Sequence, residues 1–205
     1  MKLAVFGATG GTGKQVVEQA LAAGHTVAVL VRDPAKLAIN NPALTVKRGN
    51  VLEPEDVFNT VSGADAVVVS LGNTSNNPDG VVAKGTANVV AAMQKSGVAR
   101  LLVVTSIGVG ESKDQVPFAF KALMATVLRK AMQDKEEQEK IVKASGLDWT
   151  IVRPGGLTDG PRTGNYRYGI DPKITAGQVS RADVAEFILK ELTDTQFLRK
   201  APAIT

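Results

Sequence analysis

A glycine-rich turn joins a short apolar strand to a helix at the start of the chain. Residues 2–6 (KLAVF) lead into Gly7, Gly10 and Gly13, and a helical pattern (KQVVEQALAAG) follows at 14–24. Glycine permits a tight turn at position 7, a close backbone approach to a ligand at position 10, and close helix–strand packing at position 13. The helix then offers free N–H groups and a positive dipole end to an anion. This order predicts the first βαβ unit of a dinucleotide-binding sheet.

The same alternation of short β-branched runs and amphipathic helices continues along the chain. Several of the runs are almost continuously apolar, as parallel strands covered on both faces require. We predict further strands at 26–31, 44–48, 65–71, 100–106 and 148–153, and helices at 86–96, at 180–192 and from around Phe118. Gly97 is typical of a helix C-cap, and Ser180 with Asp183 resembles a capping box. We expect a single α/β domain over 1–205, a Rossmann-type doubly wound parallel sheet with helices on both faces.

One segment interrupts this pattern. Residues 155–178 are rich in Gly, Pro and Asp and form a connection longer than is usual in a compact domain. They follow the carboxyl end of a predicted strand, where open α/β sheets bind their ligands. We interpret the segment as a substrate-side loop, with a flexible insertion as the alternative.

Composition excludes several classes of function. The 205 residues include no cysteine, which removes disulfides, thiolate metal sites and cysteine nucleophiles. No apolar run is long enough to span a membrane, and a net charge of +4 with only 4% aromatic residues gives no nucleic-acid pattern. We interpret Glu136, Glu137 and Glu139 as a solvated helix face rather than a metal site. We therefore expect a cytoplasmic protein with no metal, no nucleic-acid or membrane partner and no need of a dimer, since a monomer suits a domain of this size.

The second predicted strand indicates which dinucleotide binds. An acidic residue about 20 positions beyond the glycines is typical of NAD sites. Here Arg32 stands 19 residues after Gly13. A guanidinium at this place pairs with a 2′-phosphate through charge-assisted hydrogen bonds, so NADP(H) is favoured as the cofactor. Asp33 precedes Pro34 and is interpreted as a turn or helix-cap residue.

Four stretches carry a resemblance to a known family: VFGATGGTGKQVV, VLVRDPAKL, VVTSIG and GLDWTIVRPGGLTDGPRTG. They resemble the atypical short-chain dehydrogenase/reductase group, and within it the biliverdin-IXβ reductase/flavin reductase family and its NAD(P)H-binding bacterial relatives. The resemblance implies an active-site serine at Ser106 and a catalytic lysine at Lys135. It also implies contacts to the cofactor. The phosphates would contact Gly7, Thr9, Gly10, Gly11, Thr12 and Gly13, and the 2′-phosphate would contact Arg32. The adenine would lie near Asn50 and Val51, and the nicotinamide side would be lined by Leu71, Gly72, Pro154, Gly155, Gly156 and Leu157.

Two positions depart from that family. Typical short-chain dehydrogenases carry a proton-donating tyrosine four residues before the lysine, and Ala131 stands there instead. The vertebrate biliverdin-IXβ reductases have a histidine where this chain has Gly155 and Gly156. The only histidine, His25, follows Gly24 between a helix and a strand, which indicates a surface turn without a chemical role.

The missing tyrosine favours particular substrates. Reduction of a simple carbonyl needs an acid for the developing alkoxide, whereas a flavin or linear tetrapyrrole delocalises its own charge. We therefore expect hydride transfer from NADPH to a flat conjugated acceptor such as FMN, FAD or biliverdin, stacked over a Gly-Gly floor at 155–156. Arg162, Arg167 and Lys173 are candidates for the acceptor's acidic groups, with ordinary surface charge as the alternative. A quinone or carbonyl reductase, and a non-catalytic NADP(H)-binding redox sensor or scaffold, remain as other functions.

Overall fold

The computed structural model describes residues 1–73, 77, 79–117, 121 and 126–205. An eight-stranded sheet has the order β3-β2-β1-β4-β5-β6-β10-β8, and a separate parallel pair is formed by β7 and β9. All neighbours in the large sheet are parallel except β10 and β8. The strands are β1 (Lys2–Phe6), β2 (Thr26–Val31), β3 (Leu44–Arg48), β4 (Ala66–Val69), β5 (Arg100–Val104), β6 (Asp148–Pro154), β7 (Gly156–Thr158), β8 (Tyr168–Gly169), β9 (Gln178–Ser180) and β10 (Ala203–Ile204).

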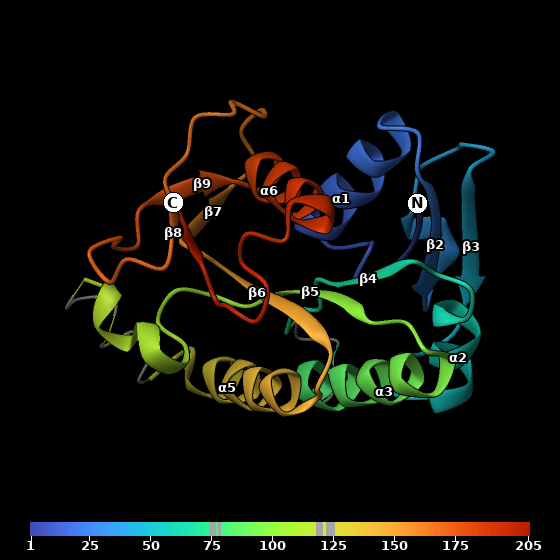
Figure 1. Ribbon diagram of the computed structural model, residues 1–205, viewed down its shortest axis with the longest axis horizontal. Helices are drawn as coiled ribbons and strands as arrows, with labels where there is room; N and C mark the ends of the chain where they lie inside the picture. The colour runs from blue at the N-terminus through green and yellow to red at the C-terminus, as the bar shows by residue number, and fades with distance from the viewer. Residues whose placement is uncertain (74–76, 78, 118–120, 122–125) are drawn as a thin grey trace.

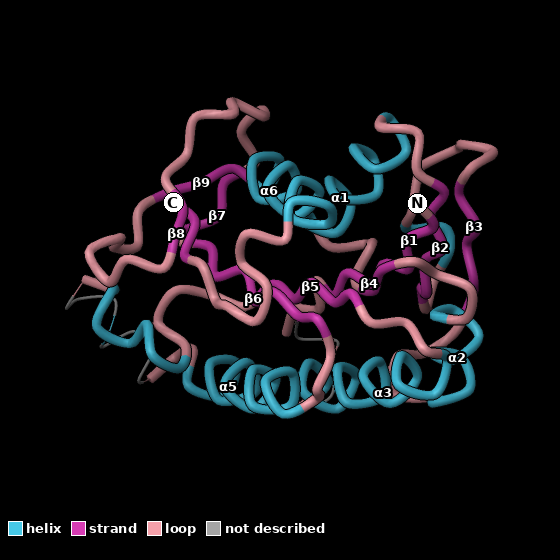
Figure 2. Tube along the Cα trace, in the orientation of Figure 1, coloured by secondary structure: helices cyan, strands magenta, loops and turns pink. Residues whose placement is uncertain are grey.

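Helices cover both faces of this sheet (Figure 1). Helices α1 and α6 lie side by side on one face, and α2, α3 and α5 form the layer on the other, as the tube view also shows (Figure 2). The helices are α1 (Gly11–Ala22), α2 (Pro54–Val61), α3 (Val81–Ser96), α5 (Arg129–Ala144) and α6 (Arg181–Asp194), with short 3-10 turns η1 (Pro34–Lys36) and η2 (Gly110–Gln115). The expected doubly wound α/β fold is confirmed, with the strand order 3-2-1-4-5-6 typical of dinucleotide-binding sheets.

The apolar runs form strands because both of their faces are buried. Along β1, Leu3 and Val5 point into the apolar cluster under α1 and α6, whereas Ala4 and Phe6 point into the cluster under α2, α3 and α5. Successive side chains of a strand face opposite sides of the sheet, so an unbroken apolar run serves two cores at once. This explains why the sequence pattern located β1, β2, β4, β5 and β6, whereas the edge strand β3, which was also predicted, has no fully buried residue.

Several predicted caps are confirmed. Gly97 ends α3 in the left-handed conformation with φ of 72°, and the Ser180 side chain accepts a hydrogen bond from the backbone N–H of Asp183 at the start of α6. Asp33 caps η1 by accepting from the N–H of Ala35. Helix α3 begins at Val81, five residues before the predicted start. The predicted helix start near Phe118 lies outside the described residues, and the described helix α5 begins at Arg129.

The segment 155–178 contains more regular structure than a plain loop. It includes β7 and β8, and its end enters β9. Strand β10 lies between β6 and β8, so the segment is tied to the sheet by β10 from a distant part of the chain. The N–H of Gly155 donates to the Ile204 carbonyl at 2.9 Å, and the N–H of Arg167 donates to the Thr205 carbonyl at 2.8 Å. The pairing partner was not visible locally, which is why the sequence pattern missed these short strands.

The outer face of α5 differs from the predicted solvated face at one position. Glu136 and Glu137 form surface ion pairs with Lys113 and Lys140, but Glu139 is only 2% exposed. The interpretation of Glu139 as a solvated residue is therefore wrong. Its position is two residues from Glu137 along the helix, so the two carboxylates point in very different directions.

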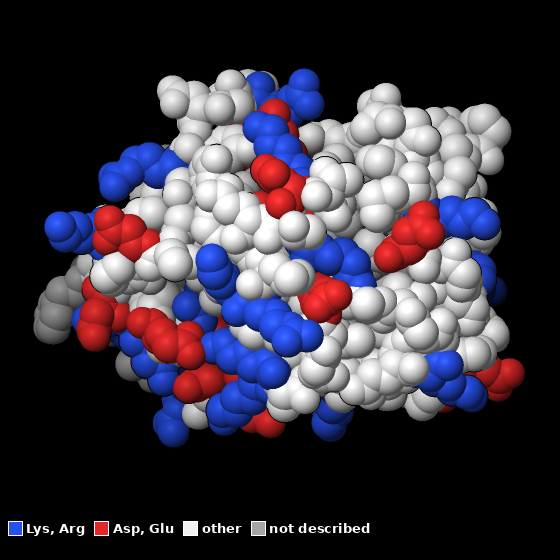
Figure 3. Space-filling view, viewed as in Figure 1, with Lys and Arg blue, Asp and Glu red and all other residues white. Residues whose placement is uncertain are grey.

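Charges of both signs are mixed on the surface shown in Figure 3, where lysines and arginines over the region of α5 alternate with acidic residues. The pairs Lys113–Glu136, Lys140–Glu137 and Lys143–Glu111 belong to this region. Within the described part of the chain, no helix is long and apolar enough to cross a membrane.

Candidate functional site

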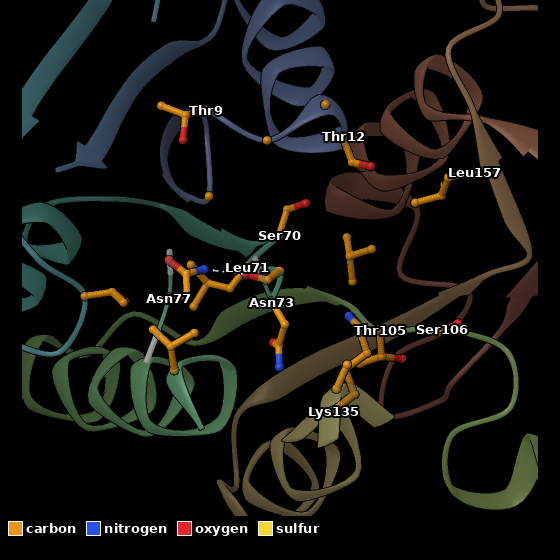
Figure 4. Close-up of a pocket in the computed structure, with 18 of the residues that line it drawn as sticks. Thr9, Thr12, Ser70, Leu71, Asn73, Asn77, Thr105, Ser106, Lys135 and Leu157 are labelled. Carbon is orange, nitrogen blue, oxygen red and sulfur yellow. Dashed lines mark hydrogen bonds between the residues drawn. The ribbon is translucent and has the colours of Figure 1, made fainter. Parts of the chain in front are cut away.

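A cavity of about 640 Å³ opens at the carboxyl ends of the central strands. The switch point of the sheet lies there, because β1 is followed by a helix on one face and the neighbouring β4 by a helix on the other. Figure 4 shows the side chains that enter the cavity. The predicted site residues that line it are Gly7, Thr9, Gly10, Gly11, Thr12, Arg32, Asn50, Val51, Leu71, Gly72, Ser106, Lys135, Pro154, Gly155 and Leu157.

Each glycine of the turn after β1 is explained by a different structural feature. Gly7 has a φ of +89°, and a Cβ there would lie 2.2 Å from the Ser70 carbonyl oxygen. A Cβ on Gly13 would lie 2.2 Å from the Gly7 carbonyl oxygen, so Gly13 permits helix packing and does not line the cavity. Gly10 is the N-cap of α1 and provides no side-chain cap, and the first turn of α1 has no acidic residue. The first N–H groups of α1 therefore remain available to an anionic ligand.

The opposite end of the cavity is lined by residues that follow β2 and β3. Arg32 follows β2 directly and is exposed at the cavity wall. Asn50 and Val51 form the next part of the wall, where the Asp56 carboxylate accepts from the Asn50 N–H at 2.9 Å. Asp33 uses its carboxylate to cap η1, so the acidic residue next to Arg32 is engaged elsewhere. This arrangement leaves a guanidinium where a 2′-phosphate is expected.

Lys135, Ser106 and Ala131 meet in the same cavity. Lys135 rises from α5 beside Thr105, and Ser106 follows at the end of β5 (Figure 4). Burial lowers the pKa of Lys135 to about 8, against the opposing attraction of Asp134 and Glu139. Ala131 lies one helical turn before Lys135 and presents only a methyl group to the cavity. Ala131, which stands where typical short-chain dehydrogenases have a tyrosine, is thus part of the cavity wall.

A buried ion-pair network supports the floor beneath Thr105. The Glu139 carboxylate accepts from the Thr105 hydroxyl at 2.9 Å and from two nitrogens of Arg153, at 2.9 Å and 2.5 Å. Arg153 also donates to Glu111, whose pKa is lowered to about 2 by hydrogen bonds from Arg153 and then Lys143. Because Arg153 immediately precedes Pro154, this network fixes β6 and α5 where both border the cavity.

A second contact orients α5 against α3. The carboxylate of Asp134 accepts from the backbone N–H groups of Val82 and Ala83, at 3.1 Å and 2.8 Å. It therefore caps the start of α3, which has no side-chain cap of its own at Gly80. Asp134 precedes Lys135, so the residue that holds α3 also sets the orientation of the helix turn carrying the cavity lysine.

The two glycines at 155–156 have a different role from the expected open floor. A Cβ on Gly155 would lie 2.6 Å from the Gly177 carbonyl oxygen, and one on Gly156 would lie 3.3 Å from the same atom. The missing side chains thus admit the backbone of Gly177, which pairs with the Gly156 N–H at 2.7 Å. Gly155 still lines the cavity with its backbone, whereas Gly156 does not, and Leu157 lies next to them.

The predicted acceptor-binding cations lie elsewhere. Arg162 and Lys173 are exposed and outside the cavity wall, and Arg167 borders a separate open groove. Backbone pairing of Arg167 with Thr205 holds it on the far side of β10. Arg162 and Arg167 therefore do not line this cavity, because the segment 155–178 runs back along β10. Their contact with the acceptor stays a prediction.

Sequence reasoning missed one cation of the cavity. Arg181, the first residue of α6, lines it together with other missed residues, namely Leu30, Val31, Gly49, Leu52, Ser70, Asn73, Asn77, Val81, Val104 and Thr105. Nothing local distinguishes Arg181 from a surface helix residue, since its role depends on α6 packing beside α1. Arg32, Lys135 and Arg181 are the cationic side chains of this wall, and no acidic side chain lines the cavity among the described residues.

The residues present suit a dinucleotide. Uncapped N–H groups at α1 and the three cationic side chains of the wall favour an anionic ligand, and the cavity extends from Arg32 to Lys135 across the switch point. Among the described residues, no cluster of His, Asp and Glu is arranged to hold a metal ion. Fold and site together define a dinucleotide-binding protein of the Rossmann type.

Comparison with known proteins places the chain more narrowly. The family described as NAD(P)H-binding matches residues 7–195, and the chain belongs to that family. Its predicted relation to the atypical short-chain dehydrogenase/reductase group is confirmed. At this level the chain is an NAD(P)H-dependent oxidoreductase.

The relatives differ in what their names describe. An uncharacterized chloroplastic protein of Arabidopsis thaliana is 37% identical over 204 residues, which cover 93% of this chain and 71% of that protein. A photosystem II assembly factor of Synechocystis is 29% identical over 166 residues, which cover 78% of this chain and 46% of that protein. The chloroplastic name shows that such relatives are not confined to the cytoplasm, so the cytoplasmic expectation stays a prediction.

Solved structures agree with the fold. An anaerobillin reductase from Escherichia coli O157:H7 has a TM-score of 0.83 and 26% identity, with 100% of this chain and 96% of that chain covered. A short-chain dehydrogenase/reductase from Veillonella parvula, solved with NADP, has a TM-score of 0.84 and 19% identity, with 99% and 93% covered. Because the Veillonella parvula protein is only 19% identical, its similarity supports the fold alone.

Proposed function

We propose that the protein is an NADPH-dependent reductase that transfers hydride to a flat conjugated acceptor, a flavin or a biliverdin-type tetrapyrrole. The observation that carries this proposal is the methyl group of Ala131 in the cavity wall, one turn from Lys135. The two tyrosines of the chain, Tyr166 and Tyr168, border the separate groove, and burial beside Glu186 raises the pKa of Tyr166. No phenol is therefore available at the cavity to protonate an alkoxide.

A conjugated acceptor removes the need for that phenol. Bound NADPH would supply a hydride, the acceptor ring would take up its two electrons, and the accompanying proton would come from solvent. The protein's own task is then to hold the two ring systems in contact. The Lys135 ammonium provides a hydrogen-bond donor at the acceptor side, and Ala131 leaves space for a ring. The Ser106 hydroxyl donates to the Ile107 carbonyl at 3.0 Å, so its oxygen is oriented as an acceptor.

The cofactor preference rests on Arg32. Its guanidinium lines the cavity at the end of β2, where an NAD site would present a carboxylate. The comparisons add indirect support, since one similar structure is described as an anaerobillin reductase, a name that indicates reduction of a tetrapyrrole.

The test is a substrate panel with the purified protein. We expect NADPH oxidation with FMN, FAD or biliverdin, and much slower oxidation with unconjugated ketones and aldehydes. Ala131→Tyr should slow turnover of the flat acceptors by about tenfold or more, because the phenol fills ring space, while NADPH binding is retained. Gln133→Tyr, at an exposed position of the same helix, serves as the matched control. Absence of turnover with all three acceptors at micromolar enzyme would refute the proposal.

A non-catalytic role is the second candidate, because one relative is named as a photosystem II assembly factor. In that case NADPH binding would persist without oxidation by any acceptor in the panel. Selective reduction of quinones or simple carbonyls would instead point to the quinone/carbonyl reductase alternative.

A further inference from the structure

Arg181 lies directly against the glycine turn. A Cβ on Gly11 would be 2.6 Å from Cδ and 2.8 Å from Nε of Arg181. A side chain at Gly11 would therefore displace the flexible Arg181 side chain from its present position, whereas the backbone conformation of Gly11 does not itself demand glycine. The Arg181 side chain covers the start of α1 and lines the cavity at that point.

The backbone of Arg181 is held firmly. Ser180 caps α6, and its hydroxyl contacts the Asp183 carboxylate at 2.8 Å. The same carboxylate accepts from the N–H groups of Thr163 and Gly164, at 2.7 Å and 2.9 Å. These bonds join the start of α6 to the segment 155–178, so the base of the arginine side chain is fixed in relation to that segment.

The guanidinium has a partner that is easily replaced. Nη1 of Arg181 contacts the Asp159 carboxylate at 2.6 Å. The arginine side chain is 27% exposed, whereas that of Asp159 is 89% exposed. An ion pair with so exposed a carboxylate is weak, because water and salt compete with it. A ligand phosphate at the start of α1 is a stronger partner, since a guanidinium binds phosphate oxygens bidentately and the helix dipole attracts the same anion.

We infer that Arg181 binds the diphosphate of the dinucleotide, and that it exchanges the Asp159 carboxylate for phosphate oxygens when the cofactor binds. Arg32 and Arg181 then divide the anionic groups of the cofactor between them, the 2′-phosphate at one end and the diphosphate in the middle. This inference rests on the proposed NADPH-binding orientation. It adds that Asp159 competes with the cofactor, so that cofactor binding frees a residue of the segment 155–178.

Two ligands distinguish the contribution of Arg181 to cofactor binding from that of Arg32. NADPH carries both the 2′-phosphate and the diphosphate, whereas adenosine 2′-monophosphate carries only the former. By calorimetry at constant salt, we expect Arg181→Gln to weaken NADPH binding by about tenfold or more and to leave adenosine 2′-monophosphate binding unchanged. Asp159→Asn should tighten NADPH binding by roughly twofold to fivefold, because it removes the competing charge. Arg199→Gln removes an exposed arginine paired with Asp148 outside the cavity and is the matched control.

The outcomes separate this inference from the proposed function. If the unmodified protein does not bind NADPH, the proposed function fails. If it binds NADPH and Arg181→Gln binds equally well, the inference is overturned and the proposed function stands. Weaker NADPH binding by Asp159→Asn would overturn the proposed exchange of the Asp159 carboxylate for phosphate oxygens. Thermal unfolding identifies any variant that is misfolded, and Arg181→Lys, which keeps the charge but loses the planar fork, should bind with intermediate affinity.

Discussion

At the scale of single residues, the chemistry of Lys135 depends strongly on its surroundings. Its neighbour Asp134 is occupied at the start of α3, and Glu139 is occupied by Arg153, so neither carboxylate neutralises it fully. Burial then lowers its pKa to about 8. A lysine of this kind changes charge near physiological pH, whereas an exposed lysine does not.

This shift predicts a pH dependence. The Lys135 ammonium attracts the anionic cofactor, so NADPH binding should weaken as pH rises above about 8. Stability should change in the opposite sense, because the unfolded chain holds this proton up to about pH 10.5 and the folded chain does not. The contribution of Lys135 to the free energy of unfolding therefore increases as pH rises from about 8 to about 10.5.

Titrations of NADPH binding from pH 6.5 to 10 check the prediction. Lys135→Met should bind more weakly and lose the dependence near pH 8, and Lys135→Arg should keep its affinity to higher pH. Lys140→Met alters an exposed lysine of the same helix and should retain the profile of the unmodified protein. An unchanged profile in Lys135→Met would show that another group titrates.

At the scale of elements, the contact of α5 with β6 depends on a buried ion pair. Glu139 and Arg153 are nearly inaccessible to water and hydrogen-bonded through two nitrogens. Glu139→Gln removes the negative charge and leaves a buried guanidinium, which we expect to lower the free energy of unfolding by about 3 kcal/mol. Glu137→Gln, two residues away in an exposed pair with Lys140, should cost less than about 1 kcal/mol. Denaturant unfolding of the two variants measures the difference, and equal costs would contradict the structure's account of this helix.

Helix α5 also shows where sequence reasoning stops. Its existence and its alignment of Ala131 with Lys135 follow from periodicity and resemblance, because both are local properties. The burial of Glu139 does not, since it depends on Arg153 of a strand that packs against the helix. In the same way, Gly155 and Gly156 read as open space, although their missing side chains are filled by the backbone of Gly177.

At the scale of the whole molecule, the central sheet and the cofactor half of the site were predictable, because the glycine turn, Arg32 and the apolar strands are local signals. The acceptor half was not. Its boundary depends on β10, which inserts between β6 and β8. One residue of the cofactor half, Arg181, was also not predictable, because it reaches the glycine turn only where α6 packs on α1. Arg162 and Arg167 lie outside this cavity because their segment pairs with β10.

Cofactor binding should stabilise the entire fold, since the cavity is lined by residues from both halves of the chain. At a concentration 100 times the dissociation constant, NADPH should add about 2.7 kcal/mol to the free energy of unfolding, a rise in Tm of roughly 5–10 °C. NADH at the same concentration should give a smaller rise, because Arg32 lacks a 2′-phosphate to bind. Arg32→Gln should remove the difference between the two cofactors in thermal scans, and Arg199→Gln should preserve it. A difference that persists in Arg32→Gln would assign the preference to another residue.

The position of β10 also sets the order in which the two halves of the site are completed during synthesis. The glycine turn, Arg32, Asn50 and Gly72 are all translated within the first third or so of the chain. The segment 155–178 obtains its partners at Ile204 and Thr205 only when those residues leave the ribosome. A growing chain therefore contains the cofactor-binding strands long before it can close the acceptor side.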